Sequence, residues 1–148
     1  MIDILIKNGY VIDPKNQVNE IKDIAIYNGK ITEYEEGEEV RHIIDAKGRY
    51  VFPGLIDSHA HMFADGTDIG IYPDSTYLPT GVTAAIDASC GVSNYQIFRN
   101  SVIARSKVTI KSFLQVSSAG LATTSFHENI NPKYFNREKI ARIYEENK

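Results

Sequence analysis

The segment Pro53-Gly54-Leu55-Ile56-Asp57-Ser58-His59-Ala60-His61 determines how the rest of the chain is interpreted. It has the pattern of an apolar strand that ends in two histidines, out of only four in the chain. Side chains alternate between the two faces of a strand, so Asp57, His59 and His61 are expected on one face. The Cα atoms of the two histidines would then lie roughly 6.6 Å apart. Both imidazoles could bind one ion at about 2.0–2.1 Å from there, which predicts half of a metal site.

Two histidines separated by one residue are a weak signal by themselves, because two unrelated polar histidines would give the same pattern. Their position favours the metal site. Barrel enzymes place catalytic groups at the C-terminal ends of parallel strands, and neutral imidazole is a common metal ligand. Asp57 could hold a histidine through its second ring nitrogen, although a strand-end hydrogen bond explains this aspartate almost as well.

The sequence after Pro53 predicts parallel βαβ architecture, since apolar strand-like runs alternate with longer helical patterns. Three strands are predicted, each apolar enough to be buried on both faces: 54–59, 82–88 and 108–116. A typical eight-unit barrel uses about 250 residues, or roughly 31 per unit. Residues 54–148 therefore have the length of about three such units.

Two helices are predicted in the same part of the chain. The first covers 93–106 and begins with a capping-box pattern at Ser93. Its apolar residues recur at helical spacing: Tyr95, Phe98 and Val102. Asn136 is placed to cap the second helix, on which Ile140 and Ile143 share a face. The first helix is thus the expected crossover between the second and third strands.

Residues 1–53 predict a small β unit of short strands separated by turn-forming residues. Residues 4–6 and 10–12 flank Asn8-Gly9 and are expected as two short antiparallel strands. The clearest hairpin signal is Asn28-Gly29 between two apolar runs, which is typical of a type I′ turn. The acidic run 35–39 is expected in a solvated turn.

Composition and charge exclude several classes of protein. The chain has 148 residues, with 16 Lys+Arg against 19 Asp+Glu and a net charge of -3, and no basic cluster, so no nucleic-acid partner is expected. Asp3 and Lys7 interrupt the first apolar run, which argues against a signal peptide. No stretch approaches the roughly 18 apolar residues that span a bilayer, so no membrane partner is expected either. The single cysteine, Cys90, excludes an internal disulfide and suits a reducing compartment, which favours the cytoplasm.

With these motifs the sequence resembles the amidohydrolase superfamily, whose members include dihydroorotases, hydantoinases, deacetylases and urease. Residues 53–61 are similar to its first-strand motif, and the preceding residues resemble its N-terminal β-sandwich part. Three segments resemble the deacetylase or dihydroorotase-like branch: 65–69, 81–88 and 115–121. The resemblance implies an α/β fold, with a β-sandwich segment over 1–53 and the first three βα units of a (β/α)8 TIM-type barrel over 54–148. The barrel would be incomplete in this chain.

The resemblance also implies a metal-dependent hydrolase with one or two divalent ions, usually zinc. A metal-activated water would attack the carbonyl of an amide, a cyclic amide or an ester in a small-molecule substrate. His59 and His61 match the family's first-strand metal ligands. The family's bridging carboxylated lysine, further histidines and catalytic aspartate would lie beyond Lys148, so the catalytic residues are unknown from this sequence.

A second function stays open: a catalytically inactive, truncated or degenerate amidohydrolase that acts, if at all, as a binding module. Two histidines leave a catalytic zinc short of its usual three protein ligands. A small metal-binding protein would need a further ligand from His127 or from the aspartates near Asp65. The substrate is not readable from the fold, and a homo-oligomer is left open.

Polar residues at the predicted strand ends could line a substrate pocket, although ordinary turns use the same residue types. They are Asp87, Ser89 and Cys90 after the second strand, and Gln115, Ser117 and Ser118 after the third. Cys90 has no neighbour that would activate a thiolate, so we expect it to pack in the core. Asp65 and Asp68 could shape a loop over the site, but an Asp-Gly-Thr turn explains them without function.

Overall fold

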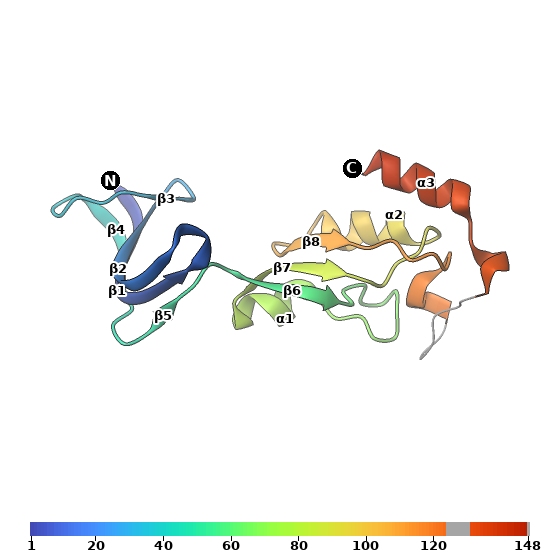
Figure 1. Ribbon diagram of the computed structural model, residues 1–148, viewed down its shortest axis with the longest axis horizontal. Helices are drawn as coiled ribbons and strands as arrows, with labels where there is room; N and C mark the ends of the chain where they lie inside the picture. Colours follow the sequence, from blue (N-terminus) through green and yellow to red (C-terminus); the bar gives the residue numbers. More distant parts are fainter. Residues whose placement is uncertain (124–130, 148) are drawn as a thin grey trace. The chain divides into compact units, whose positions relative to one another are not determined.

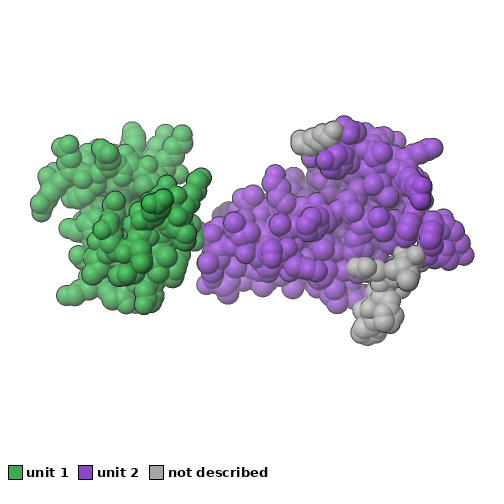
Figure 2. All heavy atoms as spheres, viewed as in Figure 1, with its two compact units in different colours: residues 1–53 green, residues 54–148 purple. Residues whose placement is uncertain are grey.

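The computed structural model describes residues 1–123 and 131–147, and the chain divides into two compact units, 1–53 and 54–148 (Figure 2). The first unit is a β-sheet, and the second combines a parallel sheet with helices. Each unit has its own cluster of buried apolar side chains. Within the described residues, we find no helix with the length and apolarity that crossing a membrane requires.

The first unit is a single five-stranded sheet. Its strands are β1 (Ile2–Asp13), β2 (Val18–Tyr27), β3 (Lys30–Thr32), β4 (Val40–Asp45) and β5 (Tyr50–Val51). The order is β3-β2-β1-β4, with β5 also paired to β1. β1 is antiparallel to β2 and parallel to β4 and β5. Ile2, Leu5 and Ala25 form the small buried cluster of this sheet.

The two Asn-Gly pairs in this sheet behave differently. Asn28-Gly29 forms the predicted hairpin turn, with the positive φ angles of 51° and 73° that a type I′ turn requires. The prediction of a turn at Asn8-Gly9 is wrong, because β1 continues through these residues with a shift in its pairing register to β2. The Asn8 N–H donates to Asp23 Oδ1 at 2.9 Å, and a Cβ on Gly9 would lie 2.5 Å from a Val51 methyl carbon. Gly9 therefore permits the close approach of β5.

The second unit contains three parallel strands in the order β6-β7-β8, seen in Figure 1 as arrows with one direction. They are β6 (Leu55–Ala60), β7 (Val82–Asp87) and β8 (Thr109–Ser112). The helices are α1 (Pro73–Tyr77), α2 (Tyr95–Phe98), which continues as a π-helical turn (Arg99–Ile103), and α3 (Arg137–Glu146). β8 is shorter than the predicted 108–116, because beyond it only an isolated bridge forms between Gly91 and Gln115.

The core of this unit lies on one face of the sheet, where α1 and α2 pack. Its members are Ala60, Met62, Phe63, Tyr77, Ala85, Cys90, Phe98, Val108 and Ile110. Cys90 packs there as expected, and burial, with the nearby Asp87 charge, raises the pKa of its thiol. The expectation that the strands are buried on both faces is wrong for β6, where Leu55 is 52% and Ile56 71% exposed. The interior of a barrel is filled by side chains from all of its strands, and this sheet has three.

The helix starts confirm one capping prediction and correct another. The Lys139 N–H donates to Asn136 Oδ1 at 2.9 Å, so Asn136 caps α3 as expected. The capping box at Ser93 is wrong, because α2 begins after Asn94 without a side-chain cap. The Asn94 side chain instead accepts from the Gly91 N–H and donates to the Ala119 carbonyl, both at 3.0 Å. This asparagine therefore joins the loops that follow β7 and β8.

Candidate metal centre

His59 and His61 lie at the C-terminal end of β6, His59 within the strand and His61 immediately after it. Their ring centroids are 5.3 Å apart, and the ring planes are inclined by 75°. Two imidazoles that bind one tetrahedral ion through nitrogens at about 2.0–2.1 Å place their centroids roughly 5 Å apart. Both the donor type and the spacing of this pair therefore fit a shared divalent ion.

A bulge in β6 decides on which face of the sheet His59 lies. Asp57 pairs with Ala85, whereas Ala60 pairs with Asp87, so β6 has one residue more than β7 between these two pairs. Ala60 and Met62 are buried in the core under the helices. His59 precedes Ala60 within the strand, so its side chain lies on the opposite face and is exposed. His61 follows the end of the strand and is half-buried.

Asp57 does not support a histidine ring, contrary to the expectation from simple alternation. Its Oδ2 accepts from the Tyr77 hydroxyl at 2.8 Å, and its Oδ1 accepts from the His59 backbone N–H at 3.0 Å. The extra residue in β6 places the Asp57 side chain on the other face from that of His59. The His59 N–H and the Tyr77 hydroxyl lower the pKa of Asp57, while burial and this carboxylate raise the pKa of Tyr77 to about 12.

Tyr77 was not identified from the sequence, although it belongs to both the core and this hydrogen-bond pair. The available signal was Pro73, since proline is favoured at the first position of a helix. A helix beginning there places Tyr77 one turn later. The sequence could therefore have predicted α1, but not the contact of its tyrosine with Asp57.

Asp87 and Ser89, at the end of β7, lie next to His61. Ser89 Oγ is 3.4 Å from His61 Nδ1 and donates to Asp87 Oδ1 at 2.8 Å. Asp87 also accepts from the backbone N–H groups of Met62 at 2.7 Å and Ser89 at 2.8 Å. Both side chains are completely buried, with 0% exposure. The end of β7 thus holds the segment that follows His61.

The polar candidates after β8 make contacts within the surrounding loops. The Gln115 amide donates to the Ala88 carbonyl at 2.5 Å, and the Ser118 hydroxyl donates to the Tyr134 carbonyl. Ser117 is buried. The side chains of Gln115 and Ser118 therefore join loop segments, and a pocket role for these three residues stays a prediction.

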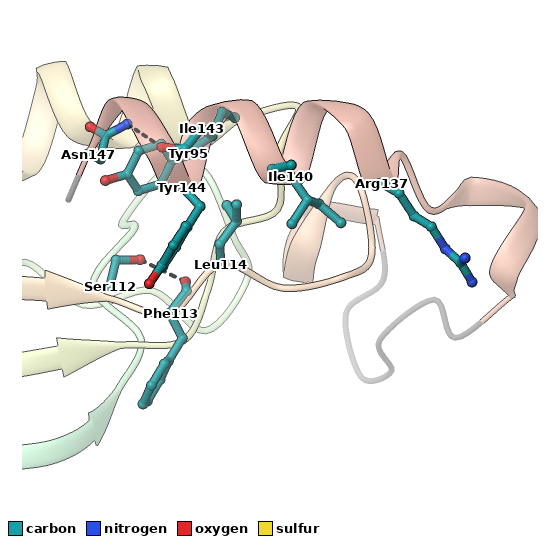
Figure 3. A pocket seen from close by; sticks show the side chains of 10 residues that line it. Tyr95, Ser112, Phe113, Leu114, Arg137, Ile140, Ile143, Tyr144 and Asn147 are labelled. Atoms are coloured by element: carbon teal, nitrogen blue, oxygen red, sulfur yellow. Dashed lines mark hydrogen bonds between the residues drawn. The ribbon is translucent and has the colours of Figure 1, made fainter.

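No further metal-binding side chain joins the two histidines in the described part of the chain. Across residues 1–123 and 131–147, no three His, Cys, Asp or Glu side chains come together in a way that could hold a metal ion. Asp65 accepts from the Tyr72 hydroxyl at 2.7 Å within a turn, Asp68 is exposed, and His127 lies outside the described residues. A groove of about 550 Å³ lies beside α3, where Figure 3 shows Leu114 and Tyr144, and neither histidine lines it.

Comparison with known proteins identifies the family of this site. Residues 42–114 match the sequence pattern of the amidohydrolase family. A deacetylase of Agrobacterium fabrum is 40% identical over 106 residues, which are 70% of this chain and 26% of that protein. A crystal structure of a dihydroorotase superposes with a TM-score of 0.79 at 30% identity, over 97% of this chain and 39% of that one. The chain belongs to the amidohydrolase superfamily.

The amidohydrolase assignment agrees with the observed architecture. An N-acyl-D-glutamate deacylase of Bordetella bronchiseptica, solved with zinc and a phosphonate inhibitor, shares the fold with a TM-score of 0.57 at 21% identity, over 83% of this chain and 31% of that one. The predicted fold class is confirmed: the second unit is part of a (β/α)8 barrel, and the three strands among its described residues do not close into one. The chain spans about a quarter of the deacetylase and about two-fifths of the dihydroorotase.

Proposed function

We propose that His59 and His61 are two ligands of a divalent metal, zinc in the first instance, in a hydrolase that cleaves amide, cyclic-amide or ester bonds. The observation that carries this proposal is the ring pair itself, with centroids 5.3 Å apart at the C-terminal end of a parallel strand. When bound, zinc polarises a substrate carbonyl and activates water for attack on it. One or two such ions are consistent with the family.

The backbone on both sides of the histidine pair is fixed by carboxylates. The His59 N–H donates to Asp57, and the N–H of Met62, the residue after His61, donates to Asp87. Because these bonds hold both ligands before an ion arrives, binding costs less ordering entropy than it would in a free loop. Asp57 and Asp87 therefore support the site through the backbone.

The remaining parts of the site are proposed to come from outside the described residues. A catalytic zinc usually has three protein ligands and one open position, and this pair accounts for two of the ligands. Deacetylases and dihydroorotases are among the relatives, which favours a carbon-nitrogen bond in a small-molecule substrate. The lone buried Cys90 favours a reducing, cytoplasmic location.

Replacement of both histidines tests the metal site. Loss of a group that only supports a metal ligand lowers metal affinity about 10–100-fold. In His59→Ala/His61→Ala both ligands themselves are removed, so we expect zinc affinity to fall by more than that. Zinc titration of the chain, purified with a chelator and then dialysed, measures this. His42→Ala is the matched control, since that histidine is exposed on β4 in the other unit. Unchanged zinc affinity in the double variant would exclude the proposal.

The alternative, a catalytically inactive relative, is favoured by the presence of only two ligands in the described part of the chain. Intact mass and zinc content of the natural gene product separate the two functions. A product of several hundred residues with one or two zinc ions supports the hydrolase. A product that ends at Lys148 without zinc supports the binding module.

A further inference from the structure

We propose that Asp87 and Ser89 are positioning residues for His61, which they hold with its ring proton on Nδ1, so that Nε2 is the free metal donor. The part of this inference that concerns the metal rests on the proposed function. The part that concerns the ring proton does not, because it depends on hydrogen bonds formed without metal. The two parts are therefore separable by experiment.

The Asp87 carboxylate is the fixed end of this arrangement. A carboxylate only accepts hydrogen bonds, and a buried one is stable only when donors surround it. Asp87 Oδ1 accepts from the Met62 N–H and from the Ser89 hydroxyl, while Oδ2 accepts from the Ser89 N–H. Three donors therefore compensate its complete burial, and the Ser89 hydroxyl proton is one of them.

The second step concerns the direction of the contact between Ser89 and His61. A serine hydroxyl has one proton and two lone pairs. Its proton lies in the 2.8 Å bond to the Asp87 carboxylate, a charge-assisted bond stronger than one to a neutral ring nitrogen. The oxygen then meets His61 Nδ1, 3.4 Å away, as an acceptor. This contact is a hydrogen bond only if Nδ1 donates, so we assign the ring proton to Nδ1, which leaves the Nε2 lone pair free.

The third step is the contrast with the neighbouring ligand. Metal-binding histidines generally donate their second ring N–H to a carboxylate, a carbonyl or water, which fixes both tautomer and orientation. His61 meets this requirement through a serine that a buried carboxylate orients. We find no hydrogen bond to the ring of His59 among the described contacts. His61 is thus the pre-oriented ligand of the pair.

The ring proton can be observed directly in the metal-free chain. Long-range ¹H–¹⁵N NMR at about pH 8, above the ordinary histidine pKa of about 6.5, distinguishes the two neutral tautomers. We expect His61 to be mainly the Nδ1–H form, and the exposed His42 to be mainly the Nε2–H form that free imidazole side chains prefer in water. In Ser89→Ala, His61 should shift towards the pattern of His42. An Nε2–H form of His61 in the unmodified chain would overturn the inference without any variant.

Zinc affinity supplies the second readout. Ser89→Ala is expected to weaken zinc binding about tenfold, within the 10–100-fold range for loss of a group that supports a ligand. Ser117→Ala is the matched control, because Ser117 is also buried but follows β8. The zinc affinity of this variant should equal that of the unmodified chain. If the double histidine variant loses zinc and Ser89→Ala does not, the positioning role is wrong and the metal site stands. If the Nδ1–H tautomer is present but no zinc binds, the proposed function fails and the hydrogen-bond chain stands.

Discussion

Phe98→Ala is expected to lower the free energy of unfolding of the second unit by about 3–5 kcal/mol, the range for removal of a buried phenylalanine. Phe98 is completely buried, and its ring lies 5.2 Å from that of Phe63. Its removal would leave a cavity between α2 and the sheet. Amide hydrogen exchange in β7 and β8 measures the change, because it reports on this unit separately from residues 1–53.

Ile97→Ala is the matched control for this prediction. Ile97 precedes Phe98 on the same helix but is 61% exposed, so its truncation should change the free energy of unfolding by no more than about 0.5 kcal/mol. A similar loss in both variants would show that helix formation, and not core packing, determines the stability of this unit. A small loss in Phe98→Ala alone would contradict the core described for this unit.

Asp87→Ala is expected to lower the free energy of unfolding by about 3 kcal/mol or more, because it removes the acceptor of three buried hydrogen-bond donors. Each unsatisfied buried group costs about 1–3 kcal/mol. The donors are the Met62 N–H and both the N–H and the hydroxyl of Ser89. Urea unfolding together with exchange of the Met62 and Ser89 amides measures both the global and the local effect.

Two variants separate the hydrogen bonds of Asp87 from its volume. Asp87→Asn keeps the size of the side chain but replaces one carboxylate oxygen by an NH₂ group. That group would face the N–H or O–H donors that now bind the carboxylate, so we expect most of the loss in free energy of unfolding to remain. Asp68→Ala removes an exposed aspartate of the same unit, and its free energy of unfolding should stay within about 0.5 kcal/mol of that of the unmodified chain. Full stability of Asp87→Asn would mean that packing volume, and not acceptance of hydrogen bonds, is what this position requires.

Local sequence patterns predicted the features that depend on neighbouring residues. The Asn28-Gly29 hairpin, the Asn136 cap and the β6 and β7 strands are each specified by a few adjacent residues. The apolar face of the first helix is also confirmed, since Phe98 is buried and Tyr95 and Val102 pack against its cluster. The position of the histidine pair at a strand end follows from the same local signals.

The features that the sequence did not predict depend on contacts between distant segments. Asp57 was expected beside the histidines, but the bulge that separates them arises from pairing between β6 and β7. Gly9 and Asn94 resemble turn and cap residues, yet one admits β5 and the other joins two loops. Turn-forming residues have the same pattern in both roles, so only the tertiary structure distinguishes them.

The sequence named Asp87 and Ser89 as pocket candidates but could not assign their role. Both are strand-end residues, and their type is compatible with solvent, substrate or a hydrogen-bond network. Their complete burial is visible only in the folded structure. The same is true of the hydrogen bond from the Met62 N–H to Asp87 and of the contact between Ser89 and the His61 ring. The arrangement points to support of a metal ligand, which spacing along the chain does not indicate.

The most direct test of the metal site is anomalous X-ray diffraction at the zinc edge from crystals of the chain grown with zinc. We expect a peak between the two imidazoles, about 2.0–2.1 Å from His61 Nε2 and from one ring nitrogen of His59. Zinc bound elsewhere in the second unit, with no peak between His59 and His61, would contradict the account.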